Sequence, residues 1–247
     1  MQFADIIGQK ETKQQLAELV QHNRLSHALL FLGKEGSGSL SLAIAFAQYV
    51  VCEKVNGGKS GVGSQESGPS LFGEPENSNV EPPTLNDSCG VCPACQKAQQ
   101  LIHPDIHFSY PTVTKKPGEK PVATDFITDW REFVKLSPYG NSYDWIEQIK
   151  EKENSQGKIT AEECNDIIRK LSLKSFESVY KILIMWMPEM LGTEGNKLLK
   201  LIEEPPPNTL FILVTENEAQ VLQTIVSRCQ LVKIPSLETS EIEEALI

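Results

Sequence analysis

Three glycines have the spacing of a phosphate-binding P-loop: Gly33, Gly36 and Gly38. In a working P-loop, backbone N–H groups surround the phosphates, a lysine contacts the terminal phosphates, and a Ser or Thr hydroxyl binds magnesium. Here Ser39 stands at the lysine position and Leu40 at the hydroxyl position. The spacing therefore predicts a turn shaped for phosphate that lacks both side chains needed to hold MgATP.

The acidic residues of an ATP hydrolase are also missing. In P-loop ATPases a later strand ends in carboxylates that hold magnesium and position water. The corresponding apolar segment here ends in Trp186 and Met187, and we expect the nearest carboxylate, Glu189, to begin a surface helix. Lys34 lies five positions before the lysine position and does not replace it. We therefore expect this chain neither to bind nor to hydrolyse ATP.

Three cysteines recur at two-residue intervals, at Cys89, Cys92 and Cys95. Cys52, at the end of the predicted P-loop helix, is the candidate fourth ligand of a closed four-thiolate zinc site, which is a structural type. Two alternatives remain open: Cys52 as a small buried hydrophobic residue, and His103 as the fourth ligand.

The surroundings of the cysteines favour structural zinc over a nucleic-acid-binding zinc module. Such a module needs arginine, lysine and aromatic side chains around it, and the neighbourhood offers chiefly Lys97. The two remaining cysteines, Cys164 and Cys229, are expected to be buried thiols.

The chain has 247 residues, a formal net charge of −10 and 40% hydrophobic residues, which is typical of a soluble globular protein. An acidic balance argues against coating DNA by charge alone, so a role with nucleic acid would be exercised through partners. Neither a secretory leader nor a membrane-spanning segment is apparent, which favours a cytoplasmic location and no membrane partner.

Short apolar segments alternate with helical ones along the chain. Strands are expected at 28–32, 181–187, 210–214 and 231–234, and helices at 40–51, 126–134, 159–173 and 196–202. Thr160 and Glu163 have the spacing of a capping box at the start of the third helix. This alternation predicts an α/β fold with a mostly parallel sheet flanked by helices, and with its chemistry at the carboxyl ends of the strands.

Four segments add a resemblance to these patterns. Residues 27–33 lead into the altered P-loop, 103–105 are His-Pro-Asp, 196–206 run from Asn-Lys-Leu-Leu-Lys to Glu-Glu-Pro-Pro, and 224–230 contain Ser-Arg-Cys. With the cysteine cluster, they resemble the delta-prime subunits of bacterial DNA polymerase III clamp loaders, AAA+ proteins related to the gamma/tau ATPase subunits, over nearly the whole chain.

The resemblance implies a role for the Ser-Arg-Cys motif. Arg228, between Ser227 and Cys229, would be an arginine finger that acts in trans on a neighbouring ATPase subunit, and Thr215 matches the sensor threonine. From spacing alone, a surface arginine before an edge strand is an equally good interpretation of Arg228.

The resemblance also implies a function and partners. The chain would be a noncatalytic clamp-loader subunit that works with gamma/tau-type ATPase subunits and a delta-type subunit, and through the complex with the sliding clamp and primer–template DNA. The alternative is an active gamma/tau-type ATPase with a divergent P-loop.

The resemblance further implies a domain plan. Residues 1–236 would form an AAA+ core, 52–95 an inserted zinc module with a disordered insertion at 53–88, and 237–247 the start of a helical lid. We expect an amino-terminal part that is monomeric in isolation, because the collar that joins the subunits would follow it. The long insertion and an enlarged 123–156 region depart from the family pattern.

Overall fold

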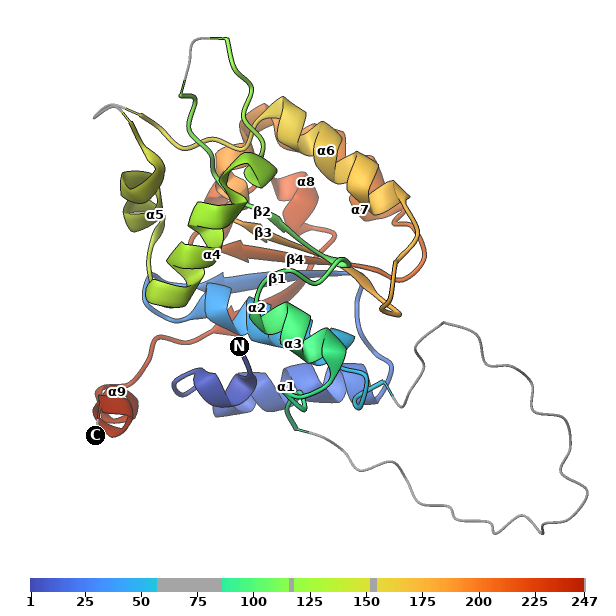
Figure 1. Ribbon diagram of the computed structural model, residues 1–247, viewed down its shortest axis with the longest axis vertical. Helices are drawn as coiled ribbons and strands as arrows, with labels where there is room; N and C mark the ends of the chain where they lie inside the picture. The colour runs from blue at the N-terminus through green and yellow to red at the C-terminus, as the bar shows by residue number, and fades with distance from the viewer. Residues whose placement is uncertain (57–85, 116–117, 152–154, 247) are drawn as a thin grey trace, which may run out of the picture.

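The computed structural model describes residues 1–56, 86–115, 118–151 and 155–246 (Figure 1). Its sheet has five strands in the order β2-β3-β4-β1-β5, and every pairing is parallel. The strands are β1 (Ala28–Gly33), β2 (Ile106–Ser109), β3 (Lys181–Trp186), β4 (Thr209–Thr215) and β5 (Gln230–Ile234). The parallel α/β fold expected from the sequence is therefore confirmed.

Strand β2 is the one strand of the described sheet that the sequence did not predict. It is four residues long, and His107 and Ser109 interrupt its apolar pattern. It lies at one edge of the sheet and pairs only with β3, where Ile106 lies opposite Ile182. Strand β5 forms the opposite edge, beside β1.

Helices cover both faces of the sheet. Alternate residues of each strand point to opposite faces, and in the central strands both sets are apolar and need to be buried. Leu29 and Phe31 of β1 pack in one core with α1, α2, α3, α4 and α5, and Leu30 packs in a second core with α6, α7 and α8. The helices are α1 (Lys10–Gln21), α2 (Ser39–Val51), α3 (Pro93–Gln99), α4 (Ile127–Leu136), α5 (Ser142–Ile149), α6 (Ala161–Ser172), α7 (Asn196–Glu203), α8 (Gln223–Val226) and α9 (Thr239–Leu246).

Short 3-10 helices complete the described chain: η1 (Phe3–Asp5), η2 (Ala123–Phe126), η3 (Pro188–Gly195) and η4 (Glu218–Gln220). No helix within the described ranges is long and apolar enough to cross a membrane. The insertion expected to be disordered, 53–88, falls largely on residues 57–85, which lie outside the described residues.

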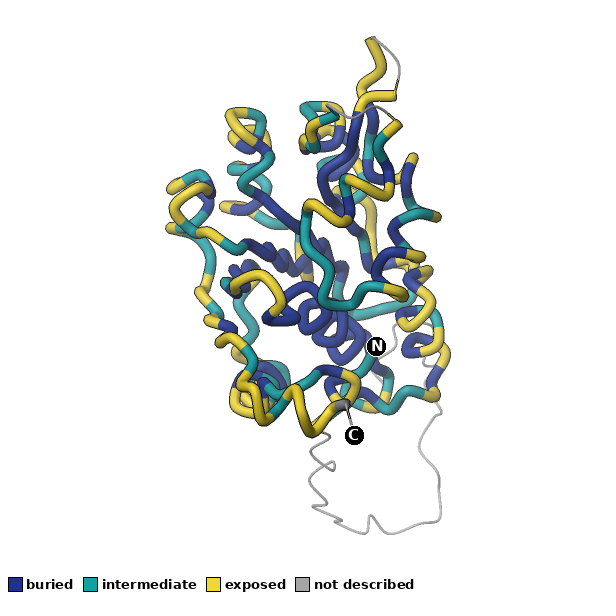
Figure 2. The backbone as a smooth tube through the Cα atoms, turned by 90° about the vertical axis from the view of Figure 1, so that its left-hand side faces the viewer, coloured by how far each residue is buried: buried dark blue, intermediate teal, exposed yellow. Residues whose placement is uncertain are grey.

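Helix α2 is the centre of the molecule. All 13 of its residues are buried, and Figure 2 shows buried backbone gathered in the middle of the tube with exposed residues around it. A helix that is apolar on all sides is stable only inside a protein. Its first residue, Ser39, follows the P-loop glycines and its last, Val51, precedes Cys52, so this helix joins the two candidate sites predicted from sequence.

Helices α4 and α5 add an aromatic cluster beside the sheet. Trp130 stacks on Tyr110 with ring centroids 4.0 Å apart, and Trp145 meets both rings edge-on. The ring centroid of Trp186, the last residue of β3, lies 5.5 Å from that of Trp130 and 5.7 Å from that of Phe133. The region 123–149 is therefore packed against the carboxyl end of the sheet.

Candidate functional site

The P-loop turn has the backbone shape that its glycines predict. It follows β1 at the carboxyl end of the sheet, and Gly36 and Gly38 have φ angles of 75° and 76°, which glycine adopts at no steric cost. Leu40 is 7% exposed within the core, and Lys34 is exposed. The turn thus keeps its glycine geometry, while the position of the magnesium-binding hydroxyl is used for packing.

A tyrosine from another part of the chain lies against this turn. A Cβ atom added to Gly38 would lie 2.6 Å from Cε1 of Tyr139. The Tyr139 hydroxyl accepts a hydrogen bond from the backbone N–H of Ile7 at 2.9 Å, and burial raises the pKa of this tyrosine. The ring therefore lies on the glycine whose missing side chain would let a phosphate approach.

The residues around Tyr139 make further contacts with the P-loop and its helix. We name residues 137–141, between α4 and α5, the covering turn. Ser41 of α2 donates a hydrogen bond to the carbonyl of Pro138, and Asn141 donates one to the carboxylate of Glu35. Contacts on both sides of Tyr139 thus fix the ring in place over the turn.

The end of β3 itself carries no carboxylate, and the nearest are Glu189 after β3 and Glu216 directly after β4. Burial and the nearby carboxylates of Glu35 and Glu189 raise the pKa of Glu216. Trp186 is 3% exposed within the aromatic cluster, and Met187 is 5% exposed. Glu189 lies in the first turn of η3, as expected, but it is partly buried, and its carboxylate accepts a hydrogen bond at 3.0 Å from the hydroxyl of Thr215. Burial raises the pKa of Glu189. This carboxylate therefore faces the sensor-like threonine.

The four cysteines predicted to form a metal site come together. The sulfur atoms of Cys52, Cys89, Cys92 and Cys95 all lie within 4.8 Å of one another, and all four thiols are free. Cys52 caps the end of α2, and Cys92 caps the start of α3, where Pro93 takes the first helical position. Two helices and the turn between Cys89 and Cys92 thus position the four sulfur atoms.

The electrostatics of the cluster suit a cation. The thiol of Cys95, with help from backbone N–H groups, lowers the pKa of Cys52 to about 4, and the same hydrogen bond raises the pKa of Cys95. The sulfur of Cys52 is therefore stabilised as a thiolate beside the thiol of Cys95. A bound metal ion deprotonates such thiols and takes them as ligands.

His103 lies outside the group formed by the four cysteines and has other partners. Its side chain is buried, its Nδ1 accepts a hydrogen bond from the N–H of Asp105, and its Nε2 lies 3.3 Å from the carboxylate of Glu177. Burial lowers the pKa of this histidine. The Asp105 carboxylate in turn accepts hydrogen bonds from three successive backbone N–H groups, those of residues 176–178. The His-Pro-Asp segment thus organises a loop.

Arg228 lies just after α8, at the opposite end of the sheet from the P-loop. Its guanidinium donates a hydrogen bond at 2.6 Å to the carbonyl of Thr224 and forms an ion pair with Glu203. Its side chain is 35% exposed. Among the other two cysteines, Cys164 is fully buried as expected, whereas Cys229 is only partly buried, with its pKa raised to about 11 by desolvation.

The distance between the two ends follows from strand geometry. Arg228 precedes β5, whereas the P-loop follows β1, and these two strands run parallel with Leu29 opposite Gln230. Six residues of β1, at about 3.3 Å each, separate the ends by roughly 20 Å. Arg228 therefore cannot reach a phosphate held by this chain's own P-loop.

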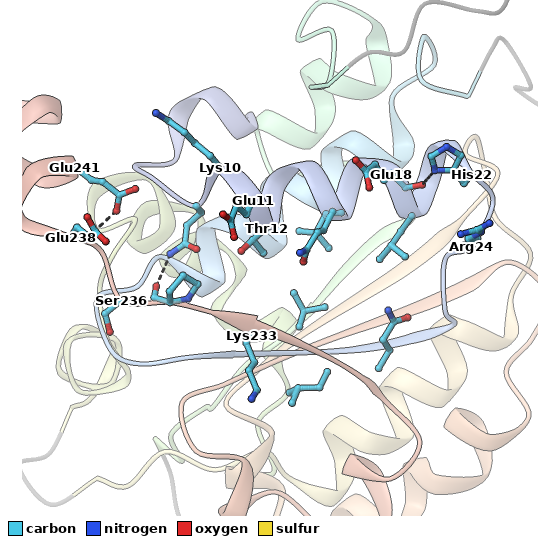
Figure 3. A pocket seen from close by; sticks show the side chains of 18 residues that line it. Lys10, Glu11, Thr12, Glu18, His22, Arg24, Lys233, Ser236, Glu238 and Glu241 are labelled. Atoms are coloured by element: carbon cyan, nitrogen blue, oxygen red, sulfur yellow. Dashed lines mark hydrogen bonds between the residues drawn. The ribbon is translucent and has the colours of Figure 1, made fainter.

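A groove of about 910 Å³ runs between α1 and β5, along the edge of the sheet. Figure 3 shows side chains of both charge signs around it, including Lys10, Arg24, Glu18 and Glu241. Gln9 crosses one end of the groove and donates a hydrogen bond at 2.7 Å to the carbonyl of Pro235. No residue of the P-loop lines this groove, but Gln9 connects the two because it also donates a hydrogen bond at 3.4 Å to the carbonyl of Ser37.

The sequence did not predict two of the contacts at these sites: the packing of Tyr139 on Gly38, and the ion pair of Glu203 with Arg228. The Pro138-Tyr139-Gly140 segment signals a turn, but a turn signal does not say what the turn covers. Neither partner could be assigned without the fold.

The sequence matches the protein family described as "DNA polymerase III, delta subunit" over residues 8–70 and 58–238. It is 26% identical over 228 residues to DNA polymerase III subunit delta' of Bacillus subtilis (strain 168), which covers 92% of this chain and 48% of that protein. It is also 26% identical over 229 residues to subunit tau of the same organism, with 92% of this chain and 28% of that protein covered.

The delta' subunit of Escherichia coli (strain K12) is 23% identical over 221 residues, which covers 88% of this chain and 45% of that protein. The chain thus spans about half the length of the delta' relatives. Among solved structures, a DNA polymerase III gamma subunit-related protein from Thermotoga maritima aligns with a TM-score of 0.47 at 15% identity, covering 92% of this chain and 47% of that one.

Proposed function

Because the chain belongs to the DNA polymerase III delta subunit family, we propose that it is a noncatalytic subunit of a bacterial clamp loader, of the delta' kind. In this proposal it works in the cytoplasm with gamma/tau-type ATPase subunits and a delta-type subunit. It takes part in loading the sliding clamp on primer–template DNA through that complex, and it hydrolyses no ATP itself.

The observation that carries the proposal is the covered P-loop. Tyr139 lies on Gly38, and the positions of the catalytic lysine and the magnesium-binding hydroxyl hold Ser39 and Leu40. Without the lysine and a metal ligand, a nucleotide would meet only backbone N–H groups, and here the tyrosine ring lies over them. These features support a degenerate ATPase.

Sequence identity does not separate the two candidate functions, because the delta' and tau relatives from Bacillus subtilis are both 26% identical to this chain. The alternative of an active gamma/tau-type ATPase requires a magnesium site at the end of β3. Trp186 and Met187 occupy that position, and Glu189 is bonded to Thr215. The site residues therefore favour the delta' function.

The proposed contribution to catalysis is Arg228, acting in trans with Ser227 and Cys229 beside it. Its place at the far end of the sheet suits action on a neighbour's nucleotide. An arginine on a transferring phosphate stabilises the charge of the transition state and accelerates hydrolysis by ~10³–10⁵ where it has been measured.

The four cysteines are proposed to hold one structural zinc ion. Zinc–sulfur bonds of about 2.3 Å in a tetrahedron place the sulfur atoms about 3.8 Å apart, and Cys89 and Cys95 are already separated by 4.0 Å. The ion would cross-link the end of α2 to the start of α3 through the four cysteines. The chain's own contacts already bring these ends together, because the backbone N–H of Cys89 donates a hydrogen bond to the sulfur of Cys52 at 3.4 Å.

The domain plan is also part of the proposal. Residues 1–236 form the AAA+ core and 52–95 the zinc module, and α9 begins the helical lid at 237–247. Asp87 joins the described part of the module to the amino-terminal residues of the core, because its carboxylate accepts hydrogen bonds from the N–H groups of Phe3 and Ala4 at 3.0 and 2.9 Å.

The test is reconstitution. The full-length protein is mixed with gamma-type and delta-type subunits, and ATP hydrolysis is measured with clamp and primer–template DNA, with and without this protein. We expect stimulated hydrolysis only in its presence, and no MgATP binding by the chain alone in calorimetry. Hydrolysis of ATP by the isolated chain would contradict the proposal. Full stimulation of hydrolysis in the absence of this protein would show that the protein has no part in the reaction.

A further inference from the structure

The guanidinium of Arg228 is held by two different parts of the chain. Nη1 donates to the carbonyl of Thr224 at 2.6 Å and to the hydroxyl of Ser227 at 3.3 Å, both within its own turn. Nη2 pairs with the carboxylate of Glu203, the last residue of α7. The side chain is therefore folded back onto α8 and tied to a neighbouring helix.

Core packing places the two charged groups together. Ile202, next to Glu203, and Ile225, three positions before Arg228, are both 1% exposed in the same core. A carboxylate in the last turn of a helix faces the negative end of the helix dipole, which is unfavourable. The position of Glu203 is thus not explained by the stability of α7, whereas the nearby arginine gives it a favourable partner.

The pair is weak enough to be exchanged. The side chains of Arg228 and Glu203 are 35% and 43% exposed, and ion pairs at such positions contribute little because water and salt screen them. A terminal phosphate group carries more negative charge and matches the planar guanidinium fork with two hydrogen bonds. A phosphate presented by another subunit can therefore replace the carboxylate.

We propose that Glu203 is a positioning residue that holds Arg228 against α8 until a neighbouring subunit presents a nucleotide phosphate. This rests on the proposed function, because it requires Arg228 to act in trans. Glu203 competes with the phosphate for the same guanidinium. Its removal therefore strengthens engagement of the neighbour's nucleotide and leaves the engaged complex, in which the carboxylate has already been displaced, unchanged.

The reconstituted loader tests this with Glu203→Gln and the matched control Glu204→Gln. Glu204 is the adjacent exposed carboxylate, and no described residue bonds its side chain. We expect Glu203→Gln to lower the KM for ATP by about two- to fivefold with kcat within about twofold of wild type, and Glu204→Gln to change neither. Added to Arg228→Ala, Glu203→Gln should have no effect. An unchanged KM, a raised KM or a lowered kcat would overturn the proposal.

A second measurement needs no partner subunit and so separates this proposal from the proposed function. Phenylglyoxal adds to unpaired guanidinium groups, and peptide mass spectrometry follows its reaction at Arg228 in the chain alone. We expect reaction about two- to fivefold faster in Glu203→Gln than in Glu204→Gln. Equal rates would overturn the holding contact. The third outcome combines two results: Arg228 reacts faster in Glu203→Gln, but Arg228→Ala leaves the ATPase rate of the reconstituted loader unchanged. It would overturn the arginine-finger function, and with it the role of Glu203 in catalysis, while the holding contact would stand.

Discussion

At the carboxyl end of the sheet, the P-loop glycines lie under the ring of Tyr139, and the positions for lysine and metal ligand hold Ser39 and Leu40. At the amino end, the guanidinium of Arg228 is 35% exposed and is held by a carboxylate that a stronger anion could replace. The first region is packed against its own chain, and the second is accessible from outside.

This difference suggests how one fold can keep part of an ATPase mechanism. The backbone of a P-loop turn can survive the loss of its chemistry, because Gly33 also lets the end of β1 lie close to Ser39 at the start of α2 and Gly38 makes room for the ring of Tyr139. An arginine that acts on a neighbour's phosphate needs no nucleotide of its own. The two ends can therefore change independently, since roughly 20 Å of strand separates them.

The largest expected effect comes from removing the cluster that holds the far end of the P-loop helix. Cys92→Ala should abolish binding of the proposed zinc and lower Tm by on the order of 10 °C, because metal binding is coupled to folding. Cys164→Ala is the control and should leave the metal content unchanged, since Cys164 is also buried but lies outside the cluster. Metal analysis and thermal unfolding give the answer, and unchanged metal content in Cys92→Ala would show that the site is assigned wrongly.

A second change attempts to restore the nucleotide site. Ser39→Lys with Leu40→Thr should bind MgATP only weakly while Tyr139 is present, and adding Tyr139→Ala should tighten binding by about 10- to 100-fold, as charge-assisted hydrogen bonds allow. Hydrolysis should still be absent, because Trp186 and Met187 stand where the metal-binding carboxylates of an ATPase would be. Calorimetry and phosphate release measure both. If the double variant binds as tightly as the triple variant, the covering turn does not block the site.

A smaller effect is expected from the Tyr139 hydroxyl alone. Tyr139→Phe keeps the ring on Gly38 but leaves the N–H of Ile7 without its acceptor, which should cost about 1 kcal/mol, or ~2–4 °C in Tm. Tyr143→Phe, at a residue 69% exposed, is the control and should leave Tm unchanged. Equal Tm values for the two variants would mean that this hydrogen bond does not fix the covering turn.

The smallest expected effect concerns Glu189. Burial raises its folded-state pKa, so the folded protein favours the protonated carboxyl. Its contribution to stability is therefore present at pH below the unfolded pKa of about 4.3 and is lost as pH rises through the raised folded pKa. Glu189→Gln keeps an acceptor for Thr215 and should raise Tm by ~1–3 °C at pH 7.5, with the gain shrinking as pH falls.

The control for that prediction is Glu132→Gln, at an exposed position of α4. Magnesium at millimolar concentration should leave the Tm of the wild-type chain unchanged. A magnesium-dependent rise in Tm that Glu189→Gln removes would show that this carboxylate is a metal ligand, and would favour the ATPase alternative.

Much of the fold could be predicted because its central strands are continuous apolar segments. β1, β3, β4 and β5 were expected within two residues of their ends, whereas β2 was missed because polar side chains interrupt it. Thr160 caps α6 as predicted by accepting a hydrogen bond from the N–H of Glu163. The Glu163 carboxylate does not complete the capping box, because it accepts a hydrogen bond at 2.7 Å from the N–H of Ala123.

The contacts of the candidate sites also fall into those that the sequence predicted and those that it did not. Two-residue spacing and a helix end brought the four cysteines into one cluster, since local turns and a helix cap fix such positions. Tyr139 on Gly38 and Glu203 on Arg228 could not be predicted. Each contact joins segments far apart in sequence, and its geometry depends on how loops and helices pack in three dimensions.

The most direct test of the account is ATP turnover by the reconstituted loader that contains Arg228→Ala. At saturating ATP, with clamp and primer–template DNA present, we expect turnover at the neighbouring site to fall by ~10³-fold or more, with complex formation in gel filtration and metal content unchanged. Arg228→Lys should restore little, because an ammonium group cannot reproduce the planar fork of a guanidinium. Wild-type turnover by the alanine variant would contradict the account and leave Arg228 an ordinary surface residue.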